Sequence, residues 1–227
     1  MPADENATDP ALTGLGPFFS VCREAGPGSW RPLRDLLAPA VLAERVQHVR
    51  AALTRLSGVD IERRVAASTM SLGLFARLVS PVLAAGVLGV PLPRPTLDDA
   101  WWQPVEQGPW QLALTGPETA PLVADLLTDV LTSLADALAQ QYALSRQVLS
   151  GNITSAVFGA ARMVGIARPD LAPAARAAAE GLLAGPLAGT GELREDFVRS
   201  SCCLYYRIPG GGYCGDCVLA AGVPSSP

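Results

Sequence analysis

The chain has 227 residues and a net charge of -4, with 17 basic residues against 21 carboxylates. All the basic residues are arginines and the single histidine is His48, which excludes a P-loop lysine, a Schiff-base lysine and any site that needs two histidines. Phosphate binding needs a concentrated cationic face, which this acidic chain lacks, so we expect no nucleic-acid partner.

The amino-terminal segment over 1–30 is predicted to be a loosely ordered lead-in. It contains Gly26, Pro27 and Gly28 among small and polar side chains, and such a composition rarely forms regular structure. No positively charged region followed by an apolar stretch is present there, so we expect no secretory signal and a cytoplasmic protein. In the cytoplasm, cysteine clusters are more often metal or redox sites than disulfides.

Two helices are expected at the start of a mainly helical body over 31–190. Apolar residues recur at three- and four-residue spacing over 39–56, which predicts an amphipathic helix. A long apolar helix follows from 61 to about 79, and Pro81 should kink it or end it. Because the apolar run is interrupted and short for a bilayer, we interpret it as a buried helix rather than a transmembrane span.

The middle of the body is predicted to contain a small antiparallel strand region and further helices. Prolines and tryptophans are frequent over 92–114, and Gly108-Pro109 is typical of a turn between two short strands. Leucines at four-residue steps predict a helix over 118–143. Another helix is expected over 170–184, where Gly185-Pro186 should end it.

A further helix is predicted to begin at Ser150. Asn152 is a plausible N-cap for it, and Gly165 fits the position just after its last turn. Ser155 and Gly159 are small enough to let a neighbouring helix approach closely. A strand over 193–198 should then lead into the last segment of the chain.

Four of the five cysteines lie close together near the carboxyl end, namely Cys202, Cys203, Cys214 and Cys217. Four thiolates from one chain form the ligand set of a [2Fe-2S] centre or of a structural zinc. Two adjacent cysteines followed by ten residues and C-x2-C differ from the paired spacing of common zinc ribbons, which favours the cluster. Neighbouring side chains on a strand point to opposite faces, so the adjacent pair must leave the extended conformation to share one centre. Cys22 is predicted to be a free thiol.

The predicted fold class is therefore α+β, with a mainly helical body, a small antiparallel strand region and a carboxyl-terminal iron-sulfur module over 191–227. Between the two cysteine pairs, Pro209 and the glycines at 210–212 should form a loop whose amides can point at cluster sulfurs. Arg199 and Arg207 flank the module. Their charges should favour the reduced cluster, whereas Asp216 should oppose it.

The segment Cys-Cys-x2-Tyr206-Arg207-x-Pro209-x4-Cys214-Gly215-Asp216-Cys217-x-Leu219 resembles the carboxyl-terminal [2Fe-2S] signature of the FhuF family of siderophore ferric-iron reductases. Two other features are similar to family features: Asn152 at the opening of a helix, and an apolar helix containing Ser80-Pro81. One feature departs from the pattern. Many members have two consecutive arginines before the Ser/Thr-Cys-Cys, whereas here Arg199 is followed by Ser200.

The resemblance implies an oxidoreductase that acts on metal ions. Its cofactor would be a [2Fe-2S] cluster on the four cysteines, and it would reduce a ferric siderophore by one electron to release Fe(II) in the cytoplasm. The implied partners are the ferric siderophore, favoured as a hydroxamate, and an electron donor such as a ferredoxin or a flavoprotein reductase. The resemblance leaves open a peripheral position at the inner face of the membrane.

No residue beyond the cluster is predicted to be catalytic. The candidate substrate contacts are Arg199, Tyr206 and Arg207, because ferric siderophores present oxygen-rich surfaces and guanidinium is a planar multiple donor. For Arg207 a second role competes, in which it binds a backbone carbonyl and holds the loop.

Two other functions remain open from the residues. The first is a non-enzymatic iron-sulfur sensor, or a siderophore-binding protein whose cluster is structural. The second is an interaction module stabilised by zinc on the same four cysteines.

Overall fold

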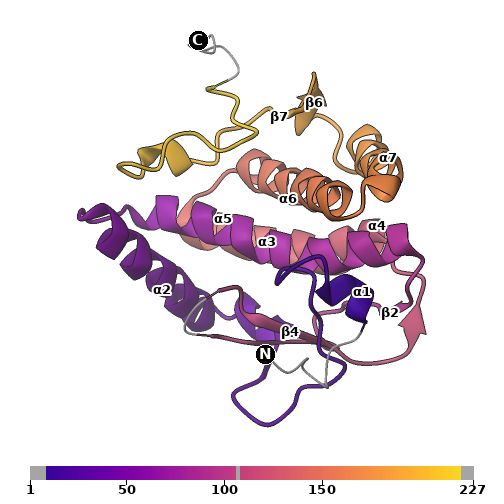
Figure 1. Cartoon of the computed structure of the whole chain (residues 1–227). Coiled ribbons are helices and arrows are strands. Elements are labelled where there is room, and N and C mark those ends of the chain that lie inside the picture. The colour runs from indigo at the N-terminus through magenta and orange to yellow at the C-terminus, as the bar shows by residue number, and fades with distance from the viewer. Residues whose placement is uncertain (1–8, 106–107, 221–227) are drawn as a thin grey trace.

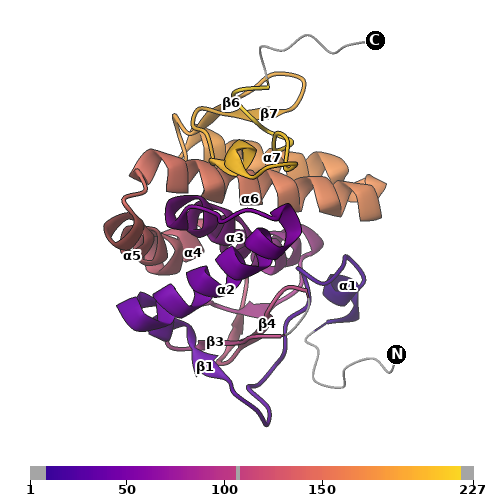
Figure 2. The same cartoon turned by 90° about the vertical axis from the view of Figure 1, so that its left-hand side faces the viewer.

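We analysed a computed structural model, which describes residues 9–105 and 108–220. Helices form the middle of the molecule, with a small sheet at one end and the cysteine segment at the opposite end (Figures 1 and 2). The predicted α+β class, helical with small antiparallel sheets, is confirmed.

The main helices are α1 (Pro10–Thr13), α2 (Pro39–Ser57), α3 (Arg63–Leu88), α4 (Val123–Leu126), α5 (Thr132–Tyr142), α6 (Arg146–Ala167) and α7 (Ala172–Ala184). A π-helical turn at Leu127–Leu131 joins α4 to α5, and 3-10 turns lie at Leu33–Leu37, Pro169–Leu171 and Tyr205–Arg207. The strands are β1 (Arg31–Pro32), β2 (Leu92–Pro93), β3 (Ala100–Gln103), β4 (Gln111–Leu114), β5 (Glu118–Thr119), β6 (Gly191–Leu193) and β7 (Phe197–Arg199). They pair in three antiparallel groups, in the orders β1-β3-β4, β2-β5 and β6-β7.

Helix α3 is the centre of the core, and it is longer than predicted. It continues past Pro81 to Leu88 and ends at Gly89, whose φ of 69° is a left-handed conformation that favours glycine. Pro81 removes one backbone hydrogen bond, but buried apolar side chains on both sides of it hold the helix together. By length and composition α3 could cross a membrane, yet 67% of its most apolar window is buried inside this fold.

The segment before β1 is not a loosely ordered lead-in where the structure describes it, from residue 9 onward. Leu12, Phe19 and Val21 are buried in the same core as α3. The buried Arg77 of α3 holds this segment by donating to the backbone oxygens of Phe18 (3.0 Å) and Ser20 (2.5 Å). Burial lowers the pKa of Arg77 to about 10, so its guanidinium is still charged at neutral pH. The burial of these three apolar side chains thus orders the segment despite its glycine-rich composition. The predicted disorder over residues 1–8 lies outside the described part.

The strands on either side of Gly108-Pro109 confirm the predicted hairpin. Strands β3 and β4 are antiparallel, with Trp102 opposite Leu112. The predicted helix over 118–143 instead begins at Val123, because Glu118 and Thr119 pair with β2 as strand β5. Tertiary pairing with β2 therefore decides the conformation at the start of this segment.

The helix predicted from Ser150 begins earlier, at Arg146. Its N-cap is Ser145, whose hydroxyl accepts from the amide of Val148 (3.2 Å). Asn152 is consequently in the helix interior and fully buried, so its predicted N-cap role is wrong. The helix also runs past Gly165 to Ala167, and Gly165 is therefore not its terminal residue.

Helix α6 packs against α3 on one side and α7 on the other. Gly159 is exposed, and a Cβ built on it would meet nothing within 4 Å, so it does not serve the close helix approach that we predicted. The strand predicted over 193–198 is a hairpin of β6 and β7 instead. Gly191 is required there, because a Cβ would lie 2.4 Å from the ring of Phe197.

Candidate metal centre

The two adjacent cysteines lie outside any strand, and the backbone turns sharply directly after them. Leu204 has a φ of 66°, which is unusual for a residue with a side chain, and the 3-10 turn Tyr205–Arg207 follows. This departure from extended structure is what the sequence required of an adjacent pair that shares one centre. The loop then returns through Gly210 (φ 76°) and Gly212 (φ 68°) to Cys214.

A buried polar network fixes the adjacent pair to the helices. Ser68 of α3 donates its hydroxyl to the carbonyl oxygen of Cys203 (2.7 Å). Asn152 of α6 donates from Nδ2 to Ser71 Oγ (2.7 Å) and to the carbonyl oxygen of Ser68 (3.3 Å). Asn152 therefore joins α3, α6 and the cysteine segment, a role that its residue type alone did not reveal.

Helix α6 also approaches the start of the cysteine segment directly. Ser201 donates its hydroxyl to the carbonyl oxygen of Gln147 (3.0 Å). A Cβ on Gly151 would lie only 2.5 Å from the Ser201 hydroxyl, so glycine is needed at this crossing. The first turns of α6 thus form the floor under the segment.

Cys203 and Cys214 come from the two ends of the loop, and their Sγ atoms lie 3.5 Å apart. Two thiolates bound tetrahedrally at about 2.3 Å to one metal ion are roughly 3.7 Å apart, so this separation suits a shared iron. The hydrogen bond between them lowers the pKa of Cys203 to about 6 and raises that of Cys214. Of these two thiols, Cys203 is therefore the one that loses its proton more readily.

Cys202 and Cys217 complete the group. Burial raises the pKa of Cys202, and the neighbouring Cys203 and Cys217 raise it further, which shows that these thiols lie within electrostatic reach of one another. The amide of Leu204 donates to Cys202 Sγ (3.3 Å), and the amide of Tyr205 stabilises the thiolate of Cys203. Both amides come from the turn directly after the adjacent pair, and contact between the glycine-loop amides and cluster sulfurs stays a prediction. Cys22 is remote in the fold, beside β4.

Arg199 brings a buried positive charge to the cysteines. Its Nη2 donates to the carbonyl oxygen of Gly151 (2.7 Å), and its Nε lies 3.4 Å from Asp216 Oδ2. Nη1 is buried and has no hydrogen-bond partner among the described residues. Such an orphaned donor within electrostatic reach of Cys202, Cys203 and Cys214 fits a dianionic cluster, because the sulfur atoms of the centre are acceptors.

The three candidate substrate contacts differ in exposure. The Arg199 side chain is fully buried, so the predicted contact with a substrate does not fit its position. Tyr206 is exposed, and so is Arg207, whose Nη1 lies 3.1 Å from Glu62 Oε2. Arg207 therefore faces outward and pairs with the N-cap residue of α3, rather than with the backbone carbonyl of the competing role.

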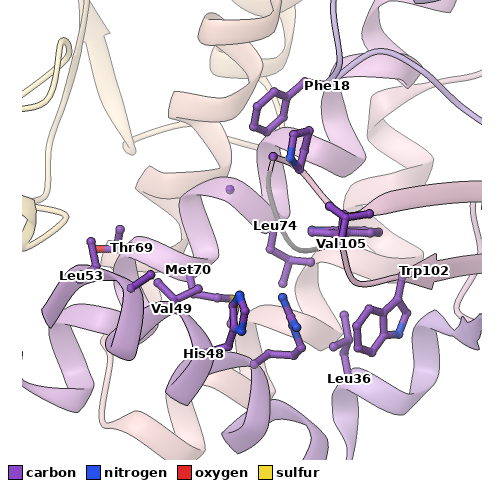
Figure 3. Close-up of a pocket in the computed structure, with 16 residues that line it drawn as sticks. Phe18, Leu36, His48, Val49, Leu53, Thr69, Met70, Leu74, Trp102 and Val105 are labelled. Carbon is purple, nitrogen blue, oxygen red and sulfur yellow. The ribbon is translucent and has the colours of Figure 1, made fainter. Parts of the chain in front are cut away.

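The structure has cavities on both sides of α3. One, of about 450 Å³, lies between α2, α3 and the β3–β4 hairpin, and includes His48, Met70 and Trp102 (Figure 3). No residue of the cysteine segment lines it. Two others, each of about 500 Å³, share Ser155, Gly159, Gly215 and Asp216, and the first of the two also includes Cys214.

The donor set fits a [2Fe-2S] cluster. In the described part of the chain no three His, Cys, Asp or Glu side chains form a group around a single metal position. A two-iron centre has a different requirement, in which each iron takes a pair of thiolates, and Cys203 with Cys214 is such a pair.

Comparison with known proteins agrees with this geometry. Residues 199–219 match the family model described as the FhuF 2Fe-2S C-terminal domain, and the match includes all four cysteines and Arg199. No curated protein matches the chain. The spacing of the thiols, the buried cation beside them and the family match support the same cofactor. The chain carries an FhuF 2Fe-2S C-terminal domain with a [2Fe-2S] cluster, as its cysteine signature predicted.

Proposed function

We propose that this protein is a ferric-siderophore reductase that gives one electron to the Fe(III) of a siderophore complex and so releases Fe(II). The observation that carries the proposal is the FhuF 2Fe-2S domain, in which two of the cysteines are half-exposed. Cys203 and Cys217 are buried, whereas Cys202 and Cys214 reach the surface, so one edge of the centre is open to a reaction partner.

The redox step needs a one-electron centre. Held by Cys202, Cys203, Cys214 and Cys217, a [2Fe-2S] cluster would supply one-electron chemistry, so that one electron from a donor protein would convert Fe(III) to Fe(II). Siderophore oxygens hold Fe(II) far more weakly than Fe(III), so the metal is then released. The chain's own residues provide the thiolates, the buried Arg199 and the walls that keep water from Cys203 and Cys217.

Exposed residues around the centre are proposed to meet the partners. Tyr206 and Arg207 remain candidates for substrate contact, because both side chains are accessible beside the cysteines. We propose a hydroxamate siderophore, a ferredoxin or flavoprotein reductase as the donor, and a cytoplasmic location at or near the inner face of the membrane.

The test is single turnover without oxygen. Protein reduced chemically and freed of reductant is mixed with a ferric trihydroxamate and a chromogenic Fe(II) chelator. We expect close to one Fe(II) per cluster, and none from a Cys214→Ser variant that lacks the centre. A wild-type protein that binds the complex but yields no Fe(II) would instead be a sensor or a siderophore-binding protein, and the reductase proposal would be wrong.

A further inference from the structure

A groove runs along the outer face of α6 beside the C-x2-C turn. Ser155, Gly159, Met163 and Ile166 follow one another at helical spacing on that face, and Gly215 with Asp216 forms the opposite wall. Met163 and Ile166 are 45% and 63% exposed. The two cavities of this groove have the size of small-molecule sites.

The groove leads to the cluster with little in the way. Gly159 and Gly215 have no side chains, and a Cβ built on either would meet nothing within 4 Å. Cys214 itself lines one of the cavities. A ligand in the groove can therefore approach one of the cluster cysteines closely, and a short distance to the cluster favours electron transfer.

Arg162 supplies the charge. It projects from α6 into a cavity that Asp196, Gly215 and Asp216 also line, and its side chain is exposed. None of the ion pairs found among the described residues involves it. The other guanidiniums near the cysteines are engaged, since Arg199 is buried against Gly151 and Arg207 pairs with Glu62. Arg176, in the same cavity, pairs with Glu180 at 2.7 Å.

We propose that the ferric siderophore binds in this α6 groove, with its apolar backbone over Gly159 and Met163 and its metal-binding oxygens toward Arg162. This inference rests on the proposed function and adds the location of its substrate. A chelate of this class has an apolar scaffold and a rim of partly negative oxygens. The groove walls are mostly apolar but also include Asp196 and Asp216, of which Asp216 lies 3.4 Å from Arg199. The oxygens are therefore expected on the side of the exposed Arg162 guanidinium.

The experiment measures binding separately from turnover. The probe is the gallium(III) complex of a trihydroxamate siderophore, which has the shape of the ferric complex but accepts no electron, and its affinity is measured by calorimetry. Gly159→Leu fills the groove, and glycine is an unfavourable helix residue, so the change should not weaken α6. Gly181→Leu on α7, where a Cβ is equally free of contacts, is the matched control.

We expect Gly159→Leu and Arg162→Gln each to weaken gallium-complex binding roughly tenfold or more, while cluster content and midpoint potential stay as in the wild type. Gly181→Leu and Arg55→Gln, an exposed arginine of α2, should bind normally. Unchanged binding in both groove variants would overturn the inference, as would a larger loss in Arg207→Gln than in either of them.

Two further outcomes separate this inference from the reductase proposal. If the groove variants bind the gallium complex normally but can no longer be reduced by the donor protein, the groove is the donor's site and the inference is wrong. If the wild type binds the complex, the groove variants do not, and no Fe(II) appears in single turnover, the site is correct and the reductase proposal fails.

Discussion

At the scale of single residues, the cysteines divide into a buried and a half-exposed pair. A hydrogen bond 3.5 Å long to Cys214 lowers the pKa of the Cys203 thiol. Thiolate is the form that binds metal, so this hydrogen bond favours the ligating form of Cys203. The remaining thiols must lose their protons when iron binds.

Serine at any of the four positions should therefore bleach or destabilise the centre. Iron and acid-labile sulfide should be near two of each per chain in the wild type, and should fall in Cys202→Ser, Cys203→Ser, Cys214→Ser and Cys217→Ser. Visible absorption and metal analysis measure this directly. Cys22→Ser is the control and should keep the full spectrum, because Cys22 lies beside β4. An unchanged spectrum in any of the four would remove that cysteine from the ligand set.

Arg199 and Asp216 should shift the midpoint potential in opposite directions. Arg199→Gln removes a buried positive charge and should lower the potential, whereas Asp216→Asn removes a negative charge and should raise it, each on the order of tens of millivolts. Redox titration followed by electron paramagnetic resonance measures both. The double variant should return toward the wild type, and shifts of the same sign in the two single variants would contradict this electrostatic account.

At the scale of elements, the junction between α3 and α6 supports the centre. Asn152 and Ser68 are completely buried and bonded to one another, and Ser68 bonds to Cys203. A helix pair joined by such a network holds the first two cysteines in place more firmly than apolar contact alone, since hydrogen bonds fix direction as well as distance.

Asn152→Ala should lower the free energy of unfolding by about 1–3 kcal/mol, because it removes the buried hydrogen bonds that the amide donates to Ser68 and Ser71. Urea denaturation of the holoprotein, followed by circular dichroism, gives this value, and loss of cluster absorption should begin at lower urea. Thr69→Ala is the control on α3, since its hydroxyl bonds to the carbonyl oxygen of Val65 in the same helix. Equal stability of Asn152→Ala and wild type would show that the network does not support the fold.

At the scale of the whole molecule, most of the core is independent of the cysteines. The buried apolar cluster is centred on α3 and α6. One residue of the cysteine segment, Ile208, belongs to it, and that segment as a whole lies at one end of the molecule (Figure 1). A core of this extent stabilises a chain of this length without a metal.

Removal of the cluster should leave the helical body folded. We expect the apoprotein to keep most of its helical circular dichroism, while the segment from about residue 190 becomes sensitive to proteases, because its contacts depend on the cysteine ligands. Limited proteolysis with mass spectrometry locates the cleavage sites. Loss of all helical signal in the apoprotein would mean that the cluster is required for the body to fold.

The sequence by itself determined the cofactor and much of the local structure. Cysteine spacing predicted the FhuF domain, and helical periodicity predicted α2 within one residue of its observed end, because both signals are local. The spacing also identified the four cysteines that would share one centre, but it did not show that Cys203 and Cys214 form the close pair.

Only the tertiary structure decided the remaining features. Asn152 looked like an N-cap and is a buried link between helices. Gly159 looked like a packing residue and lines an open groove, and Arg199 looked like a substrate contact and is buried beside the thiols. In each case the role depends on which residues from distant parts of the chain lie opposite, and local sequence patterns do not contain that information.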